Sequence, residues 1–386
     1  MPIKMEAVPG PDQLKAATPQ KDSLQTAEMA ELEAVGPDQI KQAGQKQTVL
    51  VTGHAGFIGF HTAKALLERG DKVIGFDSMN SHYDTRLKRE RLAMLEDIAK
   101  ATGSKYHHVR ADLCEPGPLQ ECLETYKVQR VIHLAGQTDK YLSHEKPAEC
   151  VQNNINAFVA LLEACRHFKI HHLTYASSHA VYGAGFQKPM SERDSANHPQ
   201  RLDAAAQRAC ELLAHSYSHQ FRLPTTGLRF FSVYGPWGRP DSVLFAFTKR
   251  ILEGKPIQIY NDGNNTRDYT YIGDLVEAIL RASDTPAEPN PVWLVELPDQ
   301  ASSNAPWRLL NVGNSLPVSI EDLIAALEHA LEKKAVKEYI TGPILEKSQS
   351  CADVSALYKA TRFRPNTPLA AGIAQFAAWY RGYYQV

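Results

Sequence analysis

The sequence predicts an α/β protein built on a doubly wound parallel sheet. Two observations predict this fold. Short apolar runs, such as residues 48–52 and 130–135, are typical of strands that a parallel sheet buries on both faces. Helical patterns, such as residues 57–69 and 203–220, separate these runs, and strand–helix alternation produces a parallel sheet covered on both sides.

The elements follow one another in a regular order. Gly70 ends the first helix, because glycine readily adopts the left-handed conformation of a helix C-terminus. Residues 284–306 are rich in proline, which predicts a surface loop. Strands are predicted at 48–52, 72–77, 130–135, 173–177 and 225–230, and helices at 57–69, 84–100, 147–167, 203–220, 319–334 and 368–384.

Residues 1–46 differ in composition from the rest of the chain. They are rich in Pro, Gln, Ala, Glu and Lys and contain no aromatic residue, which is typical of disorder. The run Gly-Pro-Asp-Gln-Leu-Lys at 10–15 recurs as Gly-Pro-Asp-Gln-Ile-Lys at 36–41, and two copies are too few for a repeat fold. We expect a disordered tail, with a docking segment for a partner as the alternative.

Composition excludes several classes of function. Among 386 residues, 42 Lys and Arg balance 43 Asp and Glu, so no basic excess points to nucleic acid as a partner. No apolar run approaches the roughly 18 residues of a membrane span, and the N-terminus lacks the apolar core of a secretion signal. Six scattered cysteines without a Cys-x-x-Cys pair suggest reduced thiols and a cytoplasmic protein.

A glycine motif opens the first predicted helix. Gly53 allows a tight turn, Gly56 lets the backbone approach a pyrophosphate, and Gly59 lets helix and strand pack closely. Phe57 and Ile58 begin the helix, whose unpaired N–H groups face the phosphates. The motif directly follows a strand, and this context indicates a dinucleotide site in a Rossmann-type sheet.

A carboxylate closes the second predicted strand. Asp77 lies 18 residues after Gly59, where a carboxylate accepts hydrogen bonds from the adenosine ribose hydroxyls. The same charge would repel the 2′-phosphate of NADP. The sequence therefore predicts NAD as the cofactor.

Two further segments follow predicted strands. Asp112, followed by Leu113, is expected to contact adenine or, alternatively, to cap a helix. The step Ala135-Gly136, followed by Gln137, brings backbone close to the cofactor. His167, His171, His172 and Cys165 straddle a helix end and a strand start, so we expect no metal site there.

Several motifs in the correct order resemble the extended short-chain dehydrogenase/reductase family. Within that family the chain looks most like the UDP-glucuronate 4-epimerases, and the likeness covers about residues 47–386. The motifs are Thr52-Gly-His-Ala-Gly-Phe-Ile-Gly59, His133-Leu-Ala-Gly-Gln137, Tyr175-Ala-Ser-Ser178, Val181-Tyr-Gly183, Arg229-Phe-Phe-Ser-Val-Tyr-Gly-Pro-Trp-Gly-Arg-Pro-Asp241, Gly254-Lys-Pro-Ile, Arg267-Asp-Tyr-Thr-Tyr-Ile and Ala352-Asp-Val-Ser-Ala-Leu.

The resemblance implies two domains that bind different ligands. Residues 47–230 would form an NAD-binding Rossmann domain. Residues 231–386 would form a smaller C-terminal α/β domain that is interleaved with the first and binds a UDP-sugar. In such epimerases a Tyr-x-x-x-Lys pair removes the proton of the sugar 4-hydroxyl while hydride moves to NAD. The resemblance also implies a homodimer that pairs helices at about 151–167 and 203–220.

The chain departs from the family at this catalytic pair. Pro199 and Glu211 fix the register, which places Asp203 at the tyrosine position and Gln207 at the lysine position. In the same register, Arg201 stands where family members usually have a serine. Aspartate is shorter than tyrosine and, with an unperturbed pKa of about 4, is a poor base for an alcohol. Glutamine supplies no positive charge. Ser178 matches the third member of the catalytic set and is retained.

Two nearby side chains offer substitutes for the missing base. Tyr141 follows Lys140 in a loop that borders the sugar site in the family, so the pair is a candidate for a relocated tyrosine and lysine. The alternative is a loop that drifted after catalysis was lost or changed. His179 is a second candidate proton carrier, with simple turn packing as the alternative.

Three arginines are expected to serve a UDP-sugar. Arg239 and Arg267 match residues that family members direct at the diphosphate, whose oxygens suit the planar guanidinium fork. Arg229 is expected to approach the sugar. Structural ion pairs are the alternative for all three.

The sequence leaves two functions open. One is an NAD-dependent nucleotide-sugar epimerase with altered or strongly reduced catalysis. The other is a non-catalytic relative that binds NAD and a UDP-sugar, as a sensor or as the partner of an active paralogue.

Overall fold

The computed structural model describes residues 46–183, 189–260, 263, 265–341 and 349–386. They form one compact unit, Lys46–Val386. The predicted tail lies outside the described residues, apart from Lys46.

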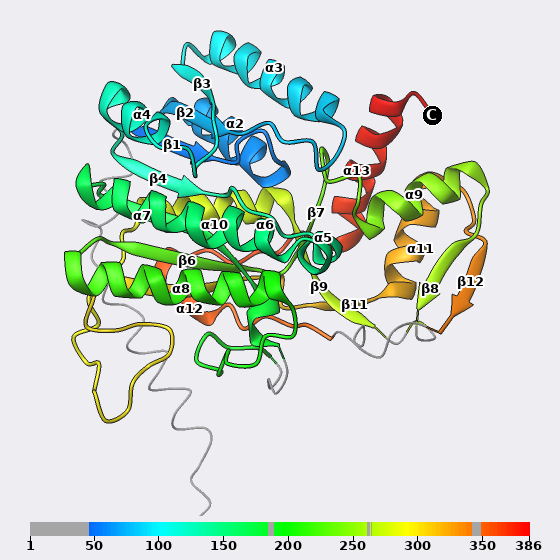
Figure 1. Cartoon of the computed structure of the whole chain (residues 1–386). Coiled ribbons are helices and arrows are strands. Elements are labelled where there is room, and N and C mark those ends of the chain that lie inside the picture. The colour runs from blue at the N-terminus through cyan, green and yellow to red at the C-terminus, as the bar shows by residue number, and fades with distance from the viewer. Residues whose placement is uncertain (1–45, 184–188, 261–262, 264, 342–348) are drawn as a thin grey trace, which may run out of the picture. The chain divides into compact units, whose positions relative to one another are not determined.

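A seven-stranded parallel sheet forms the centre of the unit, in the order β10-β6-β5-β4-β1-β2-β3 (Figure 1). This arrangement confirms the predicted doubly wound sheet. The strands are β1 (Thr48–Thr52), β2 (Lys72–Asp77), β3 (Tyr106–Arg110), β4 (Arg130–His133), β5 (His172–Ser178), β6 (Thr225–Phe230) and β10 (Trp307–Val312).

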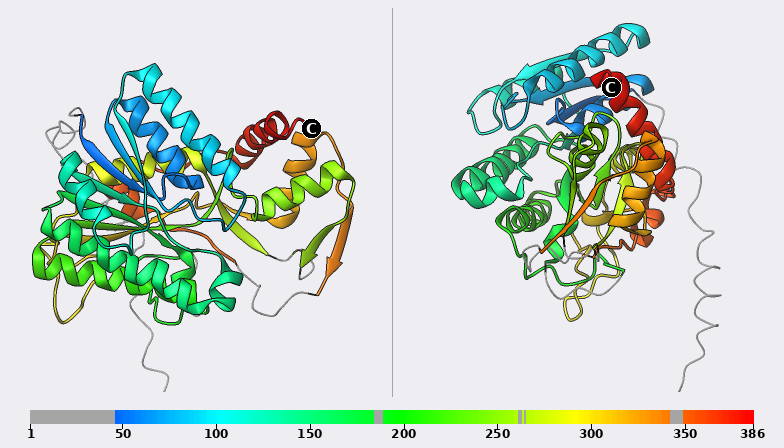
Figure 2. Two further views of the ribbon diagram at one scale, coloured as in Figure 1. Left: turned by 45° about the horizontal axis from the view of Figure 1, so that its top comes forward. Right: turned by 90° about the vertical axis from the view of Figure 1, so that its right-hand side faces the viewer.

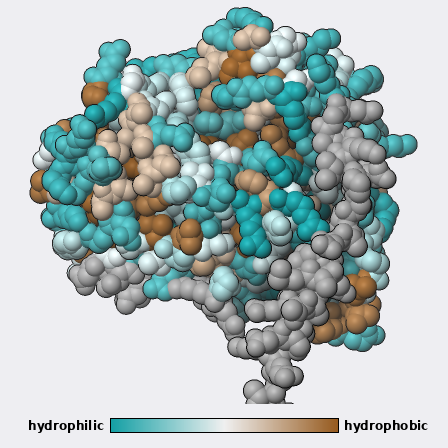
Figure 3. Space-filling view, turned by 180° about the vertical axis from the view of Figure 1, so that it is seen from behind, coloured by the Kyte–Doolittle hydropathy of each residue, from teal (hydrophilic) through white to brown (hydrophobic). Residues whose placement is uncertain are grey.

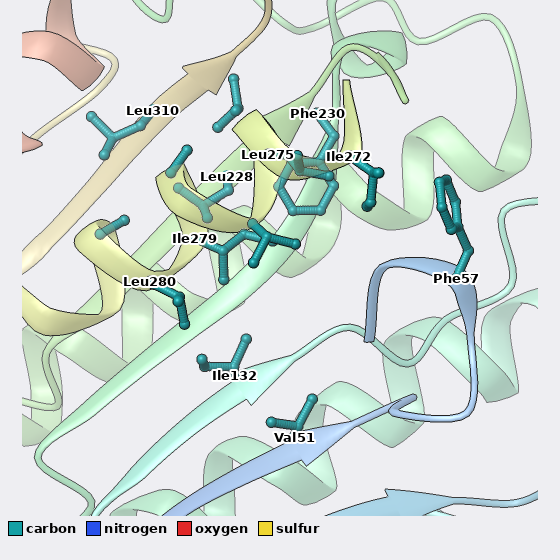
Figure 4. Close-up of a cluster of buried hydrophobic side chains, with 14 of the residues drawn as sticks. Val51, Phe57, Ile132, Leu228, Phe230, Ile272, Leu275, Ile279, Leu280 and Leu310 are labelled. Carbon is teal, nitrogen blue, oxygen red and sulfur yellow. The ribbon is translucent and has the colours of Figure 1, made fainter. Parts of the chain in front are cut away.

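Helices cover both faces of this sheet, and two apolar cores result (Figures 1 and 2). The helices of one face are α4 (Pro118–Tyr126), α7 (Ala157–His167) and α8 (Leu202–Phe221). Those of the other face are α2 (Phe57–Arg69), α3 (Thr85–Thr102), α10 (Ile272–Asp284) and α12 (Ser355–Thr361). In the second core, Ile279 and Leu275 of α10 meet Ile132 and Leu228 of the sheet (Figure 4).

Most predicted elements are confirmed within a few residues, and the helix at 57–69 has its predicted ends. The main exception is the helix predicted at 147–167. It consists of α6 (Pro147–Val151), a π-helical turn (Gln152–Asn156) and α7. Such a turn adds a residue to the helical repeat and frequently marks a functional site.

A smaller group of elements follows β6. β7 (Ser232–Tyr234), β9 (Thr266–Tyr271) and β11 (Pro317–Ser319) form one sheet, and β8 (Ile257–Tyr260) pairs with β12 (Lys337–Ile340). α9 (Val243–Glu253), α11 (Ile320–Leu331) and α13 (Leu369–Tyr384) share an apolar core with these strands. The chain returns to the large sheet through α10, β10 and α12, so the two halves are interleaved in sequence.

The proline-rich segment forms a loop between α10 and β10, as predicted. It exposes the apolar side chains of Val292, Leu294, Val295 and Leu297. From behind, a hydrophobic patch lies over this loop at the lower right (Figure 3). Within the described part of the chain, no helix is long and apolar enough to cross a membrane.

Candidate active site

A cavity of about 530 Å³ lies at the C-terminal ends of β1, β2, β4 and β5. The strand order reverses between β1 and β4, since β2 lies on one side of β1 and β4 on the other. Doubly wound sheets bind dinucleotides in the crevice at this switch point. Every residue that the sequence assigned to the cofactor lines the cavity.

The glycine turn between β1 and α2 leaves no room for side chains at Gly53 and Gly59. Gly53 has φ +69°, and a Cβ there would lie 2.7 Å from the backbone nitrogen of Ala135. A Cβ on Gly59 would lie 2.1 Å from the carbonyl oxygen of Gly53. Gly56 is the N-cap of α2 and offers no capping side chain, so the first N–H groups of the helix remain available to a phosphate.

Asp77 holds the glycine turn while it faces the cavity. One carboxylate oxygen accepts the backbone N–H of Ala55 at 3.2 Å, and the other accepts that of Met79 at 2.8 Å. Each oxygen keeps a lone pair for a further donor. The carboxylate is therefore placed to accept ribose hydroxyls.

Wild-type protein should bind NAD at least about tenfold more tightly than NADP, because the Asp77 carboxylate would face the additional phosphate. Asp77→Asn should narrow this ratio, since the amide keeps an oxygen acceptor but loses the charge. Calorimetric titration with both dinucleotides measures the ratio. Equal or tighter binding of NADP by the wild type would contradict the prediction.

Asp112 and Leu113 line the cavity beyond β3. The Asp112 carboxylate accepts the backbone N–H of Cys114 at 2.8 Å, which closes a local turn. The N-cap of the next helix, α4, is Gly117. The cap suggested as the alternative role of Asp112 is therefore wrong.

The π-helical turn positions the loop after β4. Asn154 accepts the backbone N–H of Gln137 at 2.7 Å and donates to the Gln137 carbonyl oxygen at 2.9 Å. Asn153 donates to the Gln137 side-chain oxygen at 3.0 Å. The Gln137 side-chain nitrogen is buried in the cavity wall and donates to no described residue, so it is available to a bound ligand.

Ser178, His179 and Gln207 line the end of the cavity nearest β5 and α8. The Nδ1 atom of His179 lies 3.2 Å from the Phe230 carbonyl oxygen, which only accepts, so Nδ1 carries the proton. Burial lowers the pKa of His179 to about 4. The ring is therefore neutral at pH 7, with Nε2 as an acceptor.

The Asp203 carboxylate is bound by the side chain of Arg201, two residues earlier at the start of the same helix. Arg201, the N-cap of α8, donates from Nε at 3.0 Å and from Nη2 at 2.8 Å to the two Asp203 oxygens. Ser143 donates to one of them at 3.5 Å. Asp203 is buried and absent from the cavity wall, so this pair keeps the carboxylate from the position of a base.

Tyr141 lies in α5 (Lys140–Glu145), and its side chain is 68% exposed. It is not part of the cavity wall. His179 is therefore the only one of the two proposed substitutes that the structure brings to the cavity.

The three arginines lie in different surroundings. Arg239 lines the cavity, donates to the Thr138 hydroxyl at 2.8 Å and pairs with Asp241. Arg267 lies in β9 outside the cavity wall. Arg229 is fully buried, where Nε and Nη2 each lie 2.8 Å from Glu211, so it occupies the structural role given as its alternative.

Sequence reasoning missed two cations of α3. Lys88 lines the cavity and donates to the backbone and side-chain oxygens of Asn80 at 3.0 and 2.8 Å. Arg91 is fully buried and donates to the carbonyl oxygens of Ala55 and Trp237. The burial of these two charged side chains is what marks them as functional. The helical pattern of the sequence does not reveal that burial.

No group of three or more potential metal ligands exists among the residues described here. The ring of His172 is bonded to the Ser283 carbonyl and the Thr226 hydroxyl at 2.9 Å each. Its role in the structure is therefore a buried link between β5, β6 and α10.

Comparison with known proteins agrees with this site. The model of the NAD dependent epimerase/dehydratase family matches residues 49–295. The chain belongs to this family. It is 39% identical to a probable UDP-glucuronate 4-epimerase of Rhizobium meliloti, over 87% of this chain and 97% of that one. The family resemblance predicted from the motifs is confirmed, and NAD is the cofactor.

Solved structures give the same result. A UDP-glucuronic acid 4-epimerase from Bacillus cereus, in complex with UDP-glucuronic acid and NAD, superposes with a TM-score of 0.75 at 30% identity. The match covers 87% of this chain and all of that one. MoeE5, in complex with UDP-glucuronic acid and NAD, gives a TM-score of 0.70 at 28% identity, over 87% of this chain and 99% of that one.

The residues present fit the cofactor. One cavity holds a glycine cradle that any Cβ would fill, free helix N–H groups, Asp77 and the side-chain nitrogen of Gln137, which donates to no described residue. NAD supplies hydride transfer when it is bound. The glycine turn and α2 would hold the pyrophosphate, and Asp77 would hold the adenosine ribose.

Proposed function

We propose that this chain is an NAD-dependent UDP-sugar epimerase-family protein that binds a UDP-hexuronate and epimerises it at C4 very slowly. The carrying observation is the replaced catalytic pair. Asp203 is tied to Arg201 outside the cavity wall, and Gln207 faces the cavity without a charge. General-base catalysis typically contributes about 10²–10⁴-fold, so most of the family's rate should be lost.

Arg239 supports a diphosphate ligand. Its guanidinium lies at the cavity wall and is shared between Thr138 and the carboxylate of Asp241. A diphosphate, like a carboxylate, offers a pair of acceptor oxygens to the guanidinium fork, and it carries more negative charge. It would therefore compete with Asp241 for Arg239. The UDP-sugar complexes of the related structures agree with this choice of ligand.

A non-catalytic role is the second candidate, and the Arg201–Asp203 pair favours it. Both residues depart from the family pattern, and their charges complement each other at the start of α8. Asp203 also lies in the first helical turn, where a negative charge stabilises the helix. The Arg201–Asp203 pair therefore stabilises the start of α8 but supplies no proton acceptor to the cavity.

One experiment separates fast from slow catalysis. Purified protein is incubated with UDP-glucuronate, and the products are resolved by chromatography while bound NADH is followed by absorbance. We expect UDP-galacturonate to form very slowly or not at all. Rapid turnover that survives Asp203→Ala would overturn the proposal, and Tyr141 and then His179 would be the next residues to substitute.

The chain should form a homodimer through α7 and α8, as the family resemblance implies. In α8, Leu212 is 56% exposed and Phe221 is 43% exposed, although both are large and apolar. Burial in a partner would remove these surfaces from water. Light scattering at micromolar concentration should give twice the mass of one chain, and Leu212→Glu should lower it. A monomeric mass for the wild type would contradict this expectation.

A further inference from the structure

Different residues line the two ends of the cavity. The fold therefore indicates which end of the cavity holds the adenosine and which holds the nicotinamide of the cofactor. Asp77, at the end of β2, lies on one side of the glycine turn. Ser178 ends β5, which lies on the opposite side of β1, and Gln207 of α8 joins it there. A dinucleotide whose adenosine ribose is held at Asp77 therefore places its nicotinamide at the end formed by Ser178 and Gln207.

No cationic side chain reaches the nicotinamide end of the cavity wall within the described residues. Ser178 and Gln207 carry no charge, and His179 is neutral because burial lowers its pKa to about 4. Four guanidiniums of the described chain lie outside the wall on this side. Those of Arg208 and Arg229 are bonded to Glu211, and those of Arg201 and Arg267 act on His179 through their charge alone.

The rest of the wall carries more negative than positive charge. Asp77, Asp112, Asp139 and Asp241 contribute carboxylates. The cations are Lys88, hydrogen-bonded to Asn80, and Arg239, paired with Asp241. The field in the cavity therefore favours a positively charged group over a neutral one of the same shape.

The two redox states of the cofactor differ in the charge of the nicotinamide ring. The oxidised nicotinamide ring is a cation, whereas the reduced ring is neutral. We propose that this cavity selects NAD⁺ over NADH, and that the neutral side chain of Gln207 sets this selectivity. A lysine at position 207 would repel the oxidised ring; the amide does not, and it can still donate a hydrogen bond to a ribose hydroxyl.

The inference concerns cofactor binding and does not depend on the proposed rate of epimerisation. Occupancy of the cavity would follow the NAD⁺ concentration and respond weakly to NADH. A rapidly epimerising protein that kept this selectivity would overturn the proposed function alone. A slow protein that bound both redox states equally would overturn the selectivity alone.

The test compares dissociation constants for NAD⁺ and NADH on nucleotide-free, full-length protein. Calorimetry gives both constants, and the fluorescence of NADH provides a second measurement. For the wild type, NADH should bind at least about tenfold more weakly than NAD⁺. Protein as purified should also lack the near-ultraviolet absorbance of reduced nicotinamide.

Three substitutions at one position separate charge from shape. Gln207→Met, which is neutral and similar in length, should leave the ratio within about threefold of the wild type. Gln207→Lys should lower the ratio by about tenfold, and Gln207→Glu should raise it, because each adds a charge beside the ring. The added charges should act less strongly at high salt.

Two results would overturn the inference. One is a wild-type ratio at or below one. The other is a ratio that Gln207→Lys and Gln207→Glu shift in the same direction, since opposite charges cannot act alike through the field. Thermal melts of each variant show whether it is folded, and Gln207→Met reports any effect of lost hydrogen bonding.

Discussion

Combined substitution Arg201→Ser, Asp203→Tyr and Gln207→Lys should raise the rate of UDP-glucuronate epimerisation by about 10²–10⁴-fold over the wild type. The tyrosine restores a proton acceptor long enough to reach into the cavity. The lysine replaces Gln207, a residue that already faces the cavity. Its charge lowers the pKa of the tyrosine, which an uncharged neighbour cannot do. Product chromatography measures the rate.

Arg201 must change together with the pair because it is bonded to Asp203 through both carboxylate oxygens. With Asp203→Tyr alone, Arg201 would lose its partner at the start of α8. Its charge would remain beside the new phenol. Serine matches the family pattern at this position and caps helices well. The triple variant should therefore be more active than the double variant Asp203→Tyr with Gln207→Lys.

Single substitutions provide the controls. Tyrosine without lysine keeps a high pKa, and lysine without tyrosine has no base to tune, so each alone should gain much less than the combination. The variant Asp203→Phe with Gln207→Lys supplies the ring without its hydroxyl and should remain inactive. If the phenylalanine variant gained as much activity as the tyrosine variant, proton transfer by residue 203 would be excluded.

The cofactor half of the site could be predicted from the sequence because its rules are local. A glycine between β1 and α2 has a steric cause that lies within the turn, and the structure shows the contact that excludes a Cβ at Gly59. The same holds for Asp77, because the pattern of β2 itself places this residue at the end of the strand. The local sequence was therefore sufficient to predict those parts of the site that depend on backbone conformation.

The remaining features depend on contacts between distant residues. Arg229 looked available to a ligand, but its partner Glu211 lies on another element, 18 residues away along the chain. Arg91 connects α3 to Ala55 and Trp237. The π-helical turn that orients Asn154 interrupts a helix whose apolar pattern is continuous. Periodicity reports which face of an element is buried but not which polar groups meet there.

Substitution Glu211→Ala should lower the free energy of unfolding by about 3–5 kcal/mol, because it leaves a buried charge without its partner. Glu211 is fully buried and bonds Arg229, Arg208 and the hydroxyl of Ser177 at 2.6–2.9 Å. Removing the carboxylate leaves the buried Arg229 guanidinium, which also lies over the Tyr182 ring, without a counter-charge. Denaturant titration measures the loss.

The pH dependence distinguishes this charge effect from loss of packing. Burial alone would raise the pKa of Glu211, but the guanidiniums of Arg229 and Arg208 and the Ser177 hydroxyl hold it below its usual value. A carboxylate whose pKa is depressed by folding stabilises the protein above the unfolded pKa of about 4.3 and loses that contribution as the pH falls through the folded pKa. The stability difference between wild type and Glu211→Gln should therefore be largest near neutrality and shrink in acid.

A surface pair supplies the matched control. Glu277 and Arg281 form an ion pair in α10 in which both side chains are nearly half exposed. Glu277→Gln should change stability by less than about 1 kcal/mol, because water already screens that pair. If Glu211→Gln were as mild as Glu277→Gln at neutral pH, the buried carboxylate would not be the counter-charge on which Arg229 depends. A large loss that stayed constant down to acid pH would instead assign the effect to packing around α8 and β6.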